Sequence, residues 1–303
     1  MEAETLHRRA LTTQNNAIYG LASISNRRPG ATQYIYEDSA GQGTYAYVVD
    51  TGVRTSHREF QGRATNGFSV FPDTNIDYDG HGTHVAATIA GVTYGVAKKA
   101  NVIAVKVFRG REGTTADVMK GYEWTINDIV NKKRQNTAVV NMSLGGGVSR
   151  AFNDLVAAAS SRGIVTVVAA GNDLKDASNY SPASAPSAIT VGAVDAQWNL
   201  ARGWFDPNTG IEYGSNWGPT LDIFAPGDEI LSAGIASDSQ AVYKSGTSMA
   251  TPHVAGLALF VLSVDGVTGP QNVRDRLVAN SGKNVIGGQL NGSPNRMANN
   301  GRP

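Results

Sequence analysis

The sequence predicts an α/β fold in a single domain, with a doubly wound, mostly parallel central sheet and helices on both faces. Short runs rich in valine, isoleucine and alanine alternate with helical patterns from residue 45 onward. These runs are apolar throughout, as in strands that are buried on both faces. No linker, repeat or low-complexity stretch divides the 303 residues into two domains.

Five apolar runs are the predicted strands, because each is short and rich in β-branched residues. They are residues 45–49, 102–108, 138–144, 164–169 and 188–194. Apolar residues recur at helical spacing in the segments between them, 118–129 and 152–159, and the run 255–262 suits a buried helix. Parallel sheets bind ligands beyond the carboxyl ends of their strands, so we expect the functional residues where strands end and helices begin.

Composition argues against several classes of partner. The chain is 41% hydrophobic and 17% charged, with a formal net charge of +1. Binding to nucleic acid or to an anionic membrane needs a clustered basic surface, and the short basic runs 98–99 and 132–134 suit solvated helix ends. No apolar run approaches the ~20 residues of a membrane span. We therefore expect no nucleic-acid and no membrane partner, and the absence of cysteine excludes disulfides and thiolate metal sites.

Three segments at the predicted strand–helix junctions contain the residue types that acyl transfer requires. Asp50 follows a strand, and His81 and Ser248 each begin a helix of small residues. A helix N-terminus has free backbone N–H groups and favours negative charge, so an oxyanion beside Ser248 would be stabilised. A serine hydroxyl needs an imidazole to accept its proton, and a carboxylate orients that imidazole. Asp50, His81 and Ser248 are therefore the predicted catalytic triad. Pro252, one turn further on, lacks the N–H group that a helical hydrogen bond requires. Such a local irregularity beside the predicted nucleophile is typical of a functional site.

A second oxyanion donor is expected from the side chain of Asn172, which follows the strand 164–169. The alternatives are a cap or turn role for Asn172, a turn carboxylate at Asp50, and a metal site that includes His81 and His84. The flanking residues favour the triad. His84 and His253 are expected to be buried, hydrogen-bonded neighbours.

These motifs, in the chain order Asp, His, Ser, resemble the subtilisin superfamily of serine proteases. The resemblance is closest to the proteinase K branch and its fungal alkaline proteases of the oryzin type, and it spans residues 11–298. Further segments that carry it are 95–99, 141–147, 180–184 and 222–227. It implies a subtilisin-like three-layer fold and a secreted serine endopeptidase that cleaves proteins and peptides through an acyl-enzyme intermediate. The rivals are an esterase, a specialised processing protease and a catalytically silent binding protein.

The resemblance also implies where an extended substrate pairs with the protein as an added strand. The two edges of the cleft are assigned to Ser143, Leu144 and Gly145 on one side and to Glu112 and Gly113 on the other. The pocket for the residue before the scissile bond would be walled by residues 143–147 and 169–172, which include Ala170 and Gly171. Because these walls are small and uncharged, we expect a broad preference for large apolar or aromatic residues.

The chemistry requires no cofactor, but the resemblance implies a structural calcium ion. Its ligands would be the carbonyl oxygens of Pro186 and Ala188 and the carboxylate of Asp222, since hard oxygen donors suit calcium. The segment 201–217 is longer than expected for the family and rich in aromatic residues. It either shapes the leaving-group side of the cleft or is a surface loop that its own aromatic residues pack.

Residues 1–9 lack the apolar core of a signal peptide. They are interpreted either as the remainder of a pro-segment that was cleaved at Arg8-Arg9 or as a cloning remnant, with residues 10–303 forming the peptidase domain. The removed pro-segment is expected to be a transient inhibitor. The mature protein is expected to be a secreted, extracellular monomer.

Overall fold

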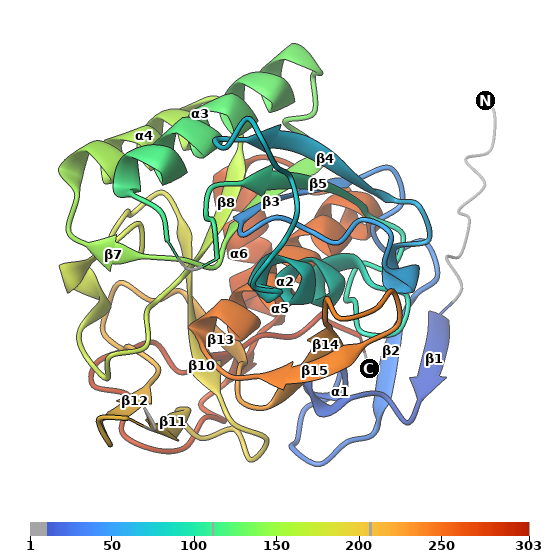
Figure 1. The fold of residues 1–303 in the computed structure, drawn as a ribbon. Coiled ribbons are helices and arrows are strands. Elements are labelled where there is room, and N and C mark those ends of the chain that lie inside the picture. The colour runs from blue at the N-terminus through green and yellow to red at the C-terminus, as the bar shows by residue number, and fades with distance from the viewer. Residues whose placement is uncertain (1–10, 111, 206–207, 303) are drawn as a thin grey trace, which may run out of the picture.

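A twisted parallel sheet lies at the centre of the computed structural model, which describes residues 11–110, 112–205 and 208–302 (Figure 1). Within these residues the sheet has nine strands in the order β16-β17-β13-β10-β8-β6-β3-β5-β4. Neighbouring strands are parallel except at one edge, where β16 is antiparallel to β17. The strands are β3 (Tyr45–Asp50), β4 (Ala64–Ser69), β5 (Asn101–Lys106), β6 (Ala138–Met142), β8 (Val165–Ala169), β10 (Ile189–Val194), β13 (Ile223–Pro226), β16 (Gly282–Lys283) and β17 (Arg296–Met297).

All five predicted strands belong to this sheet, and the α/β class is confirmed. Two of them end earlier than predicted, β5 at Lys106 and β6 at Met142, because the chain leaves the sheet there towards the cleft. The sequence did not predict β4, whose residues include a threonine, an asparagine and a glycine. Propensity alone disfavours most of these residue types in a strand, so neighbouring β5 determines the conformation.

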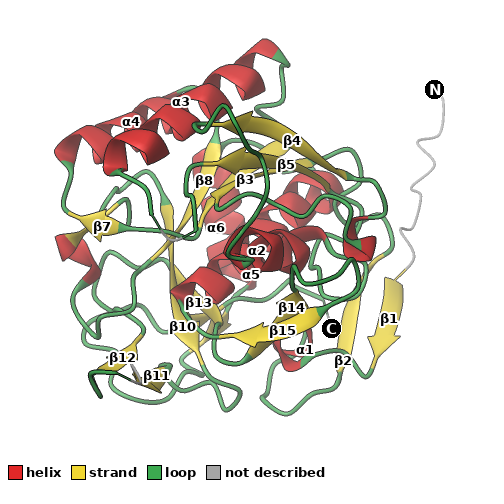
Figure 2. Ribbon diagram, in the orientation of Figure 1, coloured by secondary structure: helices red, strands yellow, loops and turns green. Residues whose placement is uncertain are grey.

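Side chains alternate across the sheet, so each strand contributes to two hydrophobic layers. On β3, Ala46 and Val48 pack in the layer that contains α2 (His81–Ala90), α5 (Thr247–Phe260) and α6 (Pro270–Asn280). Tyr47 and Val49 point the other way, into the layer of α3 (Thr115–Asn131) and α4 (Arg150–Ser161). Figure 2 shows α3 and α4 covering one face, with α2, α5 and α6 on the other.

The helical spacings predicted from the sequence are confirmed in α3 and α4. Val118, Tyr122, Ile126 and Ile129 form the buried stripe of α3. The N-terminus of α3 is fixed by a capping box, in which the side chain of Thr114 accepts a hydrogen bond from the third helical amide and the Asp side chain at that position bonds back. Both helices therefore form as amphipathic elements and bury one face against the sheet.

Helix α5 is buried on nearly every side and packs against α2, β6, β8, β10 and β13. It continues as one π-helical turn, Val261–Asp265. The sequence was expected to contain no segment that could span a membrane. The combined helix Thr247–Asp265 is nevertheless long and apolar enough to do so, and it is the only such helix among the described residues. However, 89% of the apolar window is buried inside the structure, as in the core helix of a globular protein.

Four two-stranded antiparallel sheets and short helices complete the described chain. They are β1 (Leu11–Asn15) with β2 (Gln33–Glu37), β7 (Gly146–Gly147) with β9 (Tyr180–Ser181), β11 (Arg202–Phe205) with β12 (Glu212–Gly214), β14 (Ile230–Ala233) with β15 (Ala241–Lys244), helix α1 (Tyr19–Ser23) and the 3₁₀ turns Arg58–Phe60 and Ala177–Asn179. The long segment 201–217 thus contains the hairpin β11–β12. The interpretation of residues 1–9 lies outside the described residues.

Candidate active site

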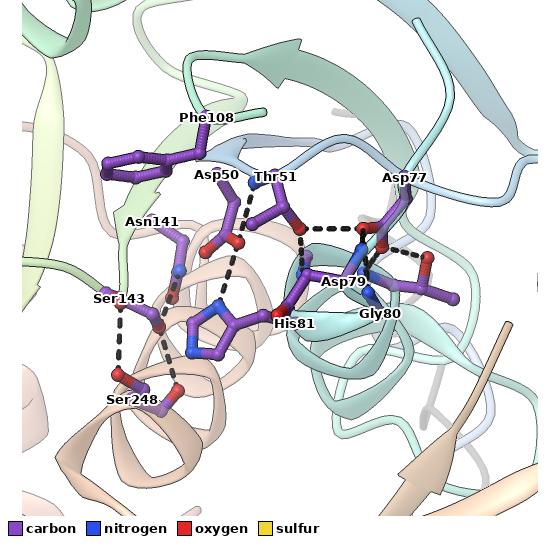
Figure 3. A network of polar contacts seen from close by, with 12 residues as sticks. Asp50, Thr51, Asp77, Asp79, Gly80, His81, Phe108, Asn141, Ser143 and Ser248 are labelled. Atoms are coloured by element: carbon purple, nitrogen blue, oxygen red, sulfur yellow. Dashed lines mark hydrogen bonds and ion pairs between the residues drawn. The ribbon is translucent and has the colours of Figure 1, made fainter. Parts of the chain in front are cut away.

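The structure places the predicted aspartate and histidine in direct contact. Asp50 is the last residue of β3, and His81 is the first residue of α2. Oδ1 of Asp50 lies 2.7 Å from Nδ1 of His81 and accepts a second hydrogen bond from the Thr51 amide at 2.7 Å (Figure 3). Because a carboxylate only accepts, Nδ1 of the imidazole is the protonated nitrogen, and Nε2 is left free to accept a proton.

The pKa of His81 is set by two opposing effects. Burial acts to lower it, but the charge and the hydrogen bond of Asp50 act to raise it, and the pKa lies above the ordinary value of 6.5. Asp50 is only 1% exposed, so little water screens this interaction. The carboxylate therefore stabilises the imidazolium that would form when His81 accepts a proton.

A buried carboxylate that sequence reasoning left unassigned holds the N-terminus of α2. Asp77 accepts five hydrogen bonds: from the Thr51 hydroxyl, from the amides of Asp79, Gly80 and Thr83, and from the Thr83 hydroxyl. These bonds satisfy free helical amides and link the turn after β3 to the start of α2. Asp77 therefore positions both Asp50 and His81. Among the described residues, no group of three or more acidic or histidine side chains is arranged to hold a metal ion.

The close approach of α2 to the turn after β3 requires glycine at position 82. A Cβ atom there would lie 2.1 Å from the Gly52 carbonyl oxygen and 3.2 Å from Oδ1 of Asp50. Any larger residue would push the helix away and lengthen the Asp50–His81 contact. The glycine that follows His81 is thus part of the geometry of the pair.

Ser248 lies in the first turn of α5 and is linked to Ser143 by two reciprocal hydrogen bonds. The Ser248 hydroxyl donates to the Ser143 carbonyl at 3.0 Å, and the Ser143 hydroxyl donates to the Ser248 carbonyl at 2.8 Å. Pro252, which lies inside the helix, has no N–H for the Ser248 carbonyl four residues earlier. Ser143 supplies the missing donor, and Asn141 in turn donates to the Ser143 hydroxyl at 3.0 Å.

The three predicted triad residues line one cavity of about 480 Å³, together with Asn172. Figure 3 shows the ring of His81 directed towards Ser248. In this structure the Ser248 hydroxyl donates to Ser143 rather than to His81. Proton transfer would require the hydroxyl to turn towards Nε2, and catalytic hydrogen bonds commonly form only when substrate is bound.

The side chain of Asn172 is oriented by Thr247. Oδ1 of Asn172 accepts hydrogen bonds from the Thr247 amide at 2.8 Å and from its hydroxyl at 2.9 Å. Because both donors occupy the oxygen, the amide nitrogen Nδ2 is the group left for the cavity that Asn172 and Ser248 share. This is the orientation that an oxyanion donor needs.

A second cavity, of about 570 Å³, adjoins Ser248 and contains most of the predicted pocket walls. Its lining residues are Leu144, Gly145, Gly146, Gly147, Ala169, Ala170, Gly171, Asn172, Asp173, Tyr180, Trp204, Tyr213, Ser245, Thr247 and Ser248. Asp173 was not among the predicted walls and adds one carboxylate to an otherwise uncharged lining. It bonds to the Tyr180 side chain, and burial together with the charge of Asp173 raises the pKa of Tyr180.

The two predicted substrate edges differ in what the structure shows of them. Ser143, Leu144 and Gly145 all line the cavity that contains the triad. Glu112 and Gly113 line neither cavity, whereas Phe108, from the same region, lines the cavity of the triad. The amide and carbonyl of Glu112 bond to Arg109 at 3.2 and 2.9 Å. The edge role of Glu112 and Gly113 therefore stays a prediction.

The predicted calcium ligands lie together but contact a cation of the protein itself. Nη2 of Arg274 donates to the carbonyls of Pro186, at 2.8 Å, and Ala188, and Nε lies 3.4 Å from Oδ1 of Asp222. A guanidinium that donates to these oxygens leaves no place for a calcium ion among them. In this structure the three residues do not fit calcium, because their oxygens already bind Arg274.

Sequence reasoning missed other residues that support the site. Lys106, buried at the end of β5, donates to the carbonyls of Thr51 and Phe108 at 2.6 Å each. Burial lowers the pKa of this ammonium. The position of Thr247 next to Ser248 could have suggested a supporting role, whereas nothing in the sequence near Lys106 points to the site.

The expected neighbours His84 and His253 are both fully buried. His84 donates from Nε2 to the Ile230 carbonyl at 2.9 Å, and His253 from Nδ1 to the Met249 carbonyl at 2.9 Å. Burial lowers the pKa of His84 to about 3 and that of His253 to about 4, so both stay neutral near pH 7. Neither competes with His81 for a proton in that range.

A carboxylate–imidazole pair beside a serine at a helix N-terminus, on a parallel α/β sheet, defines a serine hydrolase. Residues 41–299 match the Subtilase family, and the chain belongs to that family of serine endopeptidases. It is 53% identical over 292 residues to an alkaline proteinase from Hapsidospora chrysogena, covering 96% of this chain and 69% of the relative. It is 45% identical over 298 residues to a cuticle-degrading serine protease from Arthrobotrys oligospora, covering 95% and 69%.

A solved structure agrees with these sequence relatives. The structure of a cold adapted subtilisin-like serine proteinase superimposes with a TM-score of 0.83 at 38% identity and covers 94% of this chain and 99% of its own. The resemblance to fungal alkaline proteases and the subtilisin-like fold are thereby confirmed.

Proposed function

We propose that the protein hydrolyses peptide bonds with Ser248 as nucleophile, His81 as general base and Asp50 as the carboxylate that orients the imidazole. The observation that carries the proposal is the 2.7 Å contact of Asp50 with His81 at the wall of a cavity that Ser248 and Asn172 share. In the first step Nε2 of His81 takes the Ser248 proton while Oγ attacks the scissile carbonyl carbon.

The tetrahedral intermediate then carries a negative charge on the former carbonyl oxygen. Nδ2 of Asn172 and the backbone amide of Ser248 at the N-terminus of α5 are the donors available to it. The imidazolium gives its proton to the leaving amine, and an acyl-enzyme remains. Water then attacks the ester with His81 again as base, which releases the acid and restores the serine.

The proposed preference before the scissile bond is for large apolar or aromatic residues. The glycines and alanines of the 570 Å³ cavity support it, because they leave room for a ring and offer no charge. Asp173 is the one feature of the lining that favours a basic residue. Matched peptides that differ only in Phe, Leu or Arg before the scissile bond test this, and preferred cleavage after Arg that Asp173→Asn removes would reverse the assignment.

The hairpin β11–β12 is proposed to take part in substrate binding, at the cavity for the residue before the scissile bond and on the adjoining leaving-group side. Trp204 and Tyr213 line the cavity beside Asn172, and the Gly214 amide donates to the Asn172 carbonyl at 2.9 Å. The indole N–H of Trp204 donates to Asp228 at 2.6 Å, which fixes the ring against the body of the protein. These contacts favour a role in substrate binding over a loop packed by its own aromatic residues.

Secretion, a monomeric state and transient inhibition by a removed pro-segment belong to the same proposal. Secretion is supported by the relationship to a protease named for degrading cuticle, because cuticle lies outside the cells that degrade it. Immunoblotting of culture medium and cell extract tests secretion, and gel filtration of the purified protein tests the monomer. Addition of a synthetic pro-segment to the active protein tests inhibition.

The central experiment is labelling with phenylmethylsulfonyl fluoride and peptide mapping, together with casein hydrolysis by the wild type and Ser248→Ala. Stoichiometric labelling at Ser248 is expected, and casein activity should fall by roughly 10⁴–10⁶-fold in the variant. Folded wild-type protein that takes no label and cleaves neither casein nor peptide esters would instead be a silent binding protein. Turnover of esters without peptides would identify an esterase.

A further inference from the structure

The place that the family resemblance assigns to a calcium ion is taken by the side chain of Arg274, on α6. Its guanidinium bonds to two carbonyls of the loop 182–188 and pairs with Asp222, which directly precedes β13. The side chains of Arg274 and Asp222 are only 20% and 17% exposed. The contact is therefore largely shielded from water, unlike the ion pairs of the molecular surface.

Calcium and guanidinium make different demands on the same oxygens. Calcium takes about six to eight oxygen ligands at about 2.3–2.6 Å. Arg274 needs only acceptors, because a guanidinium carries five N–H donors in a fixed plane. Two carbonyls and one carboxylate face three of its five N–H groups, whereas they would supply only three or four of the roughly six to eight ligands of calcium. A calcium ion beside Arg274 would also meet a like charge at close range.

We infer that Arg274 is a built-in structural cation that replaces calcium in holding the loop 182–188 against α6 and β13. The second carboxylate oxygen of Asp222 supports this, because it accepts the Thr190 amide at 2.8 Å. The Thr190 hydroxyl donates to the Ala183 carbonyl at 2.8 Å, so the network returns to the same loop. The positive charge at the centre of this network belongs to the protein itself and does not depend on the concentration of calcium in solution.

The loop held by Arg274 continues from one wall of the substrate cavity. It directly follows β9, whose two residues, Tyr180–Ser181, pair with β7, Gly146–Gly147. Gly146, Gly147 and Tyr180 line the 570 Å³ cavity. Arg274 therefore stabilises the back of this wall, and removal of calcium from the solution should leave the wall in place.

The test uses Ser248→Ala as the parent protein, so that autolysis cannot obscure the melting temperature and the result does not depend on the proposed peptidase function. Tm is measured in calcium chloride and in EGTA. We expect the same Tm in both. Arg274→Met should lower Tm by about 4 °C or more. The matched control is Arg276→Met on the same helix, whose partner Asp265 lies 3.7 Å away and whose side chain is 44% exposed. It should lower Tm by about 2 °C or less.

Two results would overturn the inference. One is a parent protein whose Tm falls in EGTA, together with an Arg274→Met variant whose Tm equals that of the parent in calcium chloride. This result would show that the loop depends on calcium and not on Arg274. The other is calcium binding to the parent, measured by isothermal titration calorimetry, that Asp222→Asn abolishes. Should Arg274→Met fail to fold, Arg274→Lys keeps the charge but loses the planar donors, and its Tm should lie below the parent's in both solutions. An unchanged Tm for Arg274→Lys would count against the role of the guanidinium.

Discussion

The two sides of the cleft are held in place by different kinds of contact. Behind His81, the carboxylate of Asp77 is 5% exposed and accepts five hydrogen bonds from one turn and one helix end. Across the cleft, the outer part of the hairpin β11–β12 is joined by the ion pair of Arg202 with Glu212, whose side chains are 65% and 33% exposed. Such surface pairs contribute little to stability, because water and salt screen them.

This difference explains how the arrangement of the proposed catalytic residues can stay constant while the selectivity for substrate changes. Buried hydrogen bonds around the triad cannot be changed singly without leaving unpaired polar groups, which cost about 1–3 kcal/mol each. The hairpin exposes Phe205 and Ile211, and changes there leave the buried network untouched. Substitutions on the triad side should therefore affect the chemical step, and those on the hairpin side should affect the choice of substrate.

Among variants that keep Ser248, the largest effect is expected from Asn172→Leu, which keeps the size of the side chain but removes both amide functions. Turnover should fall by about 10²–10³-fold with little change in KM, because the lost donor acts on the charge of the intermediate. Steady-state kinetics on a peptide substrate measures both. A rise in KM at unchanged kcat would assign Asn172 to substrate binding instead.

Asp77→Asn should come next, because one oxygen and one N–H₂ group replace the two acceptor oxygens of the carboxylate. The start of α2 would shift, and a displacement of about 1 Å at His81 would lower kcat by about 10²-fold. The free energy of unfolding should fall by about 1–3 kcal/mol. Kinetics and urea denaturation of the same preparation separate the two losses. Wild-type kcat in a destabilised variant would make Asp77 a purely structural residue.

The pH dependence of kcat/KM tests the electrostatics of the catalytic pair. His81 acts as a base only when neutral, and Asp50 raises its pKa above 6.5. Activity should therefore be complete above the raised pKa and fall about tenfold for each pH unit below it. The midpoint of the acid limb should lie above pH 6.5. A midpoint below that value would show that burial outweighs the carboxylate.

The smallest effect is expected from Trp204→Ala, on the hairpin side. Selectivity for large residues before the scissile bond should change by a few-fold to tenfold, because Trp204 lines the 570 Å³ cavity. This change corresponds to about 1 kcal/mol of lost contact. Hydrolysis rates should stay near wild type for substrates with a small residue before the scissile bond. Phe205→Ala is the matched control, because this exposed residue lies next to Trp204 but does not line the cavity. Equal changes in both variants would refute a specific role for Trp204.

The fold and the convergence of Asp50, His81 and Ser248 on one cavity could be predicted because both follow from local patterns. Apolar runs define the strands, and parallel topology brings their carboxyl ends together, which places Asp50 near the N-termini of α2 and α5. The reciprocal bonds of Ser143 and Ser248 could not be predicted in this way. They depend on two segments 105 residues apart and on the missing N–H of Pro252.

The position of Arg274 is the clearest example of a feature that could not be predicted from the sequence. The loop carbonyls and Asp222 were assigned to calcium through the resemblance, and they do converge. The cation they bind comes from a helix about fifty to ninety residues away in sequence, and an arginine on a helix is normally solvated. Asp173 was not predicted to line the substrate cavity for a similar reason: the direction of a side chain after the end of a strand depends on tertiary contacts.

The burial of α5 has a consequence for how the enzyme fails. Ser248, the proposed nucleophile, is carried on the helix that contacts five strands of the central sheet, and local opening is cheapest where few buried contacts are lost. Ser248 therefore cannot leave its place unless the whole domain opens. Heating should therefore abolish activity in one cooperative transition, so that molecules in a warming sample are either folded or unfolded. The folded molecules would then cleave the unfolded ones, which is autolysis.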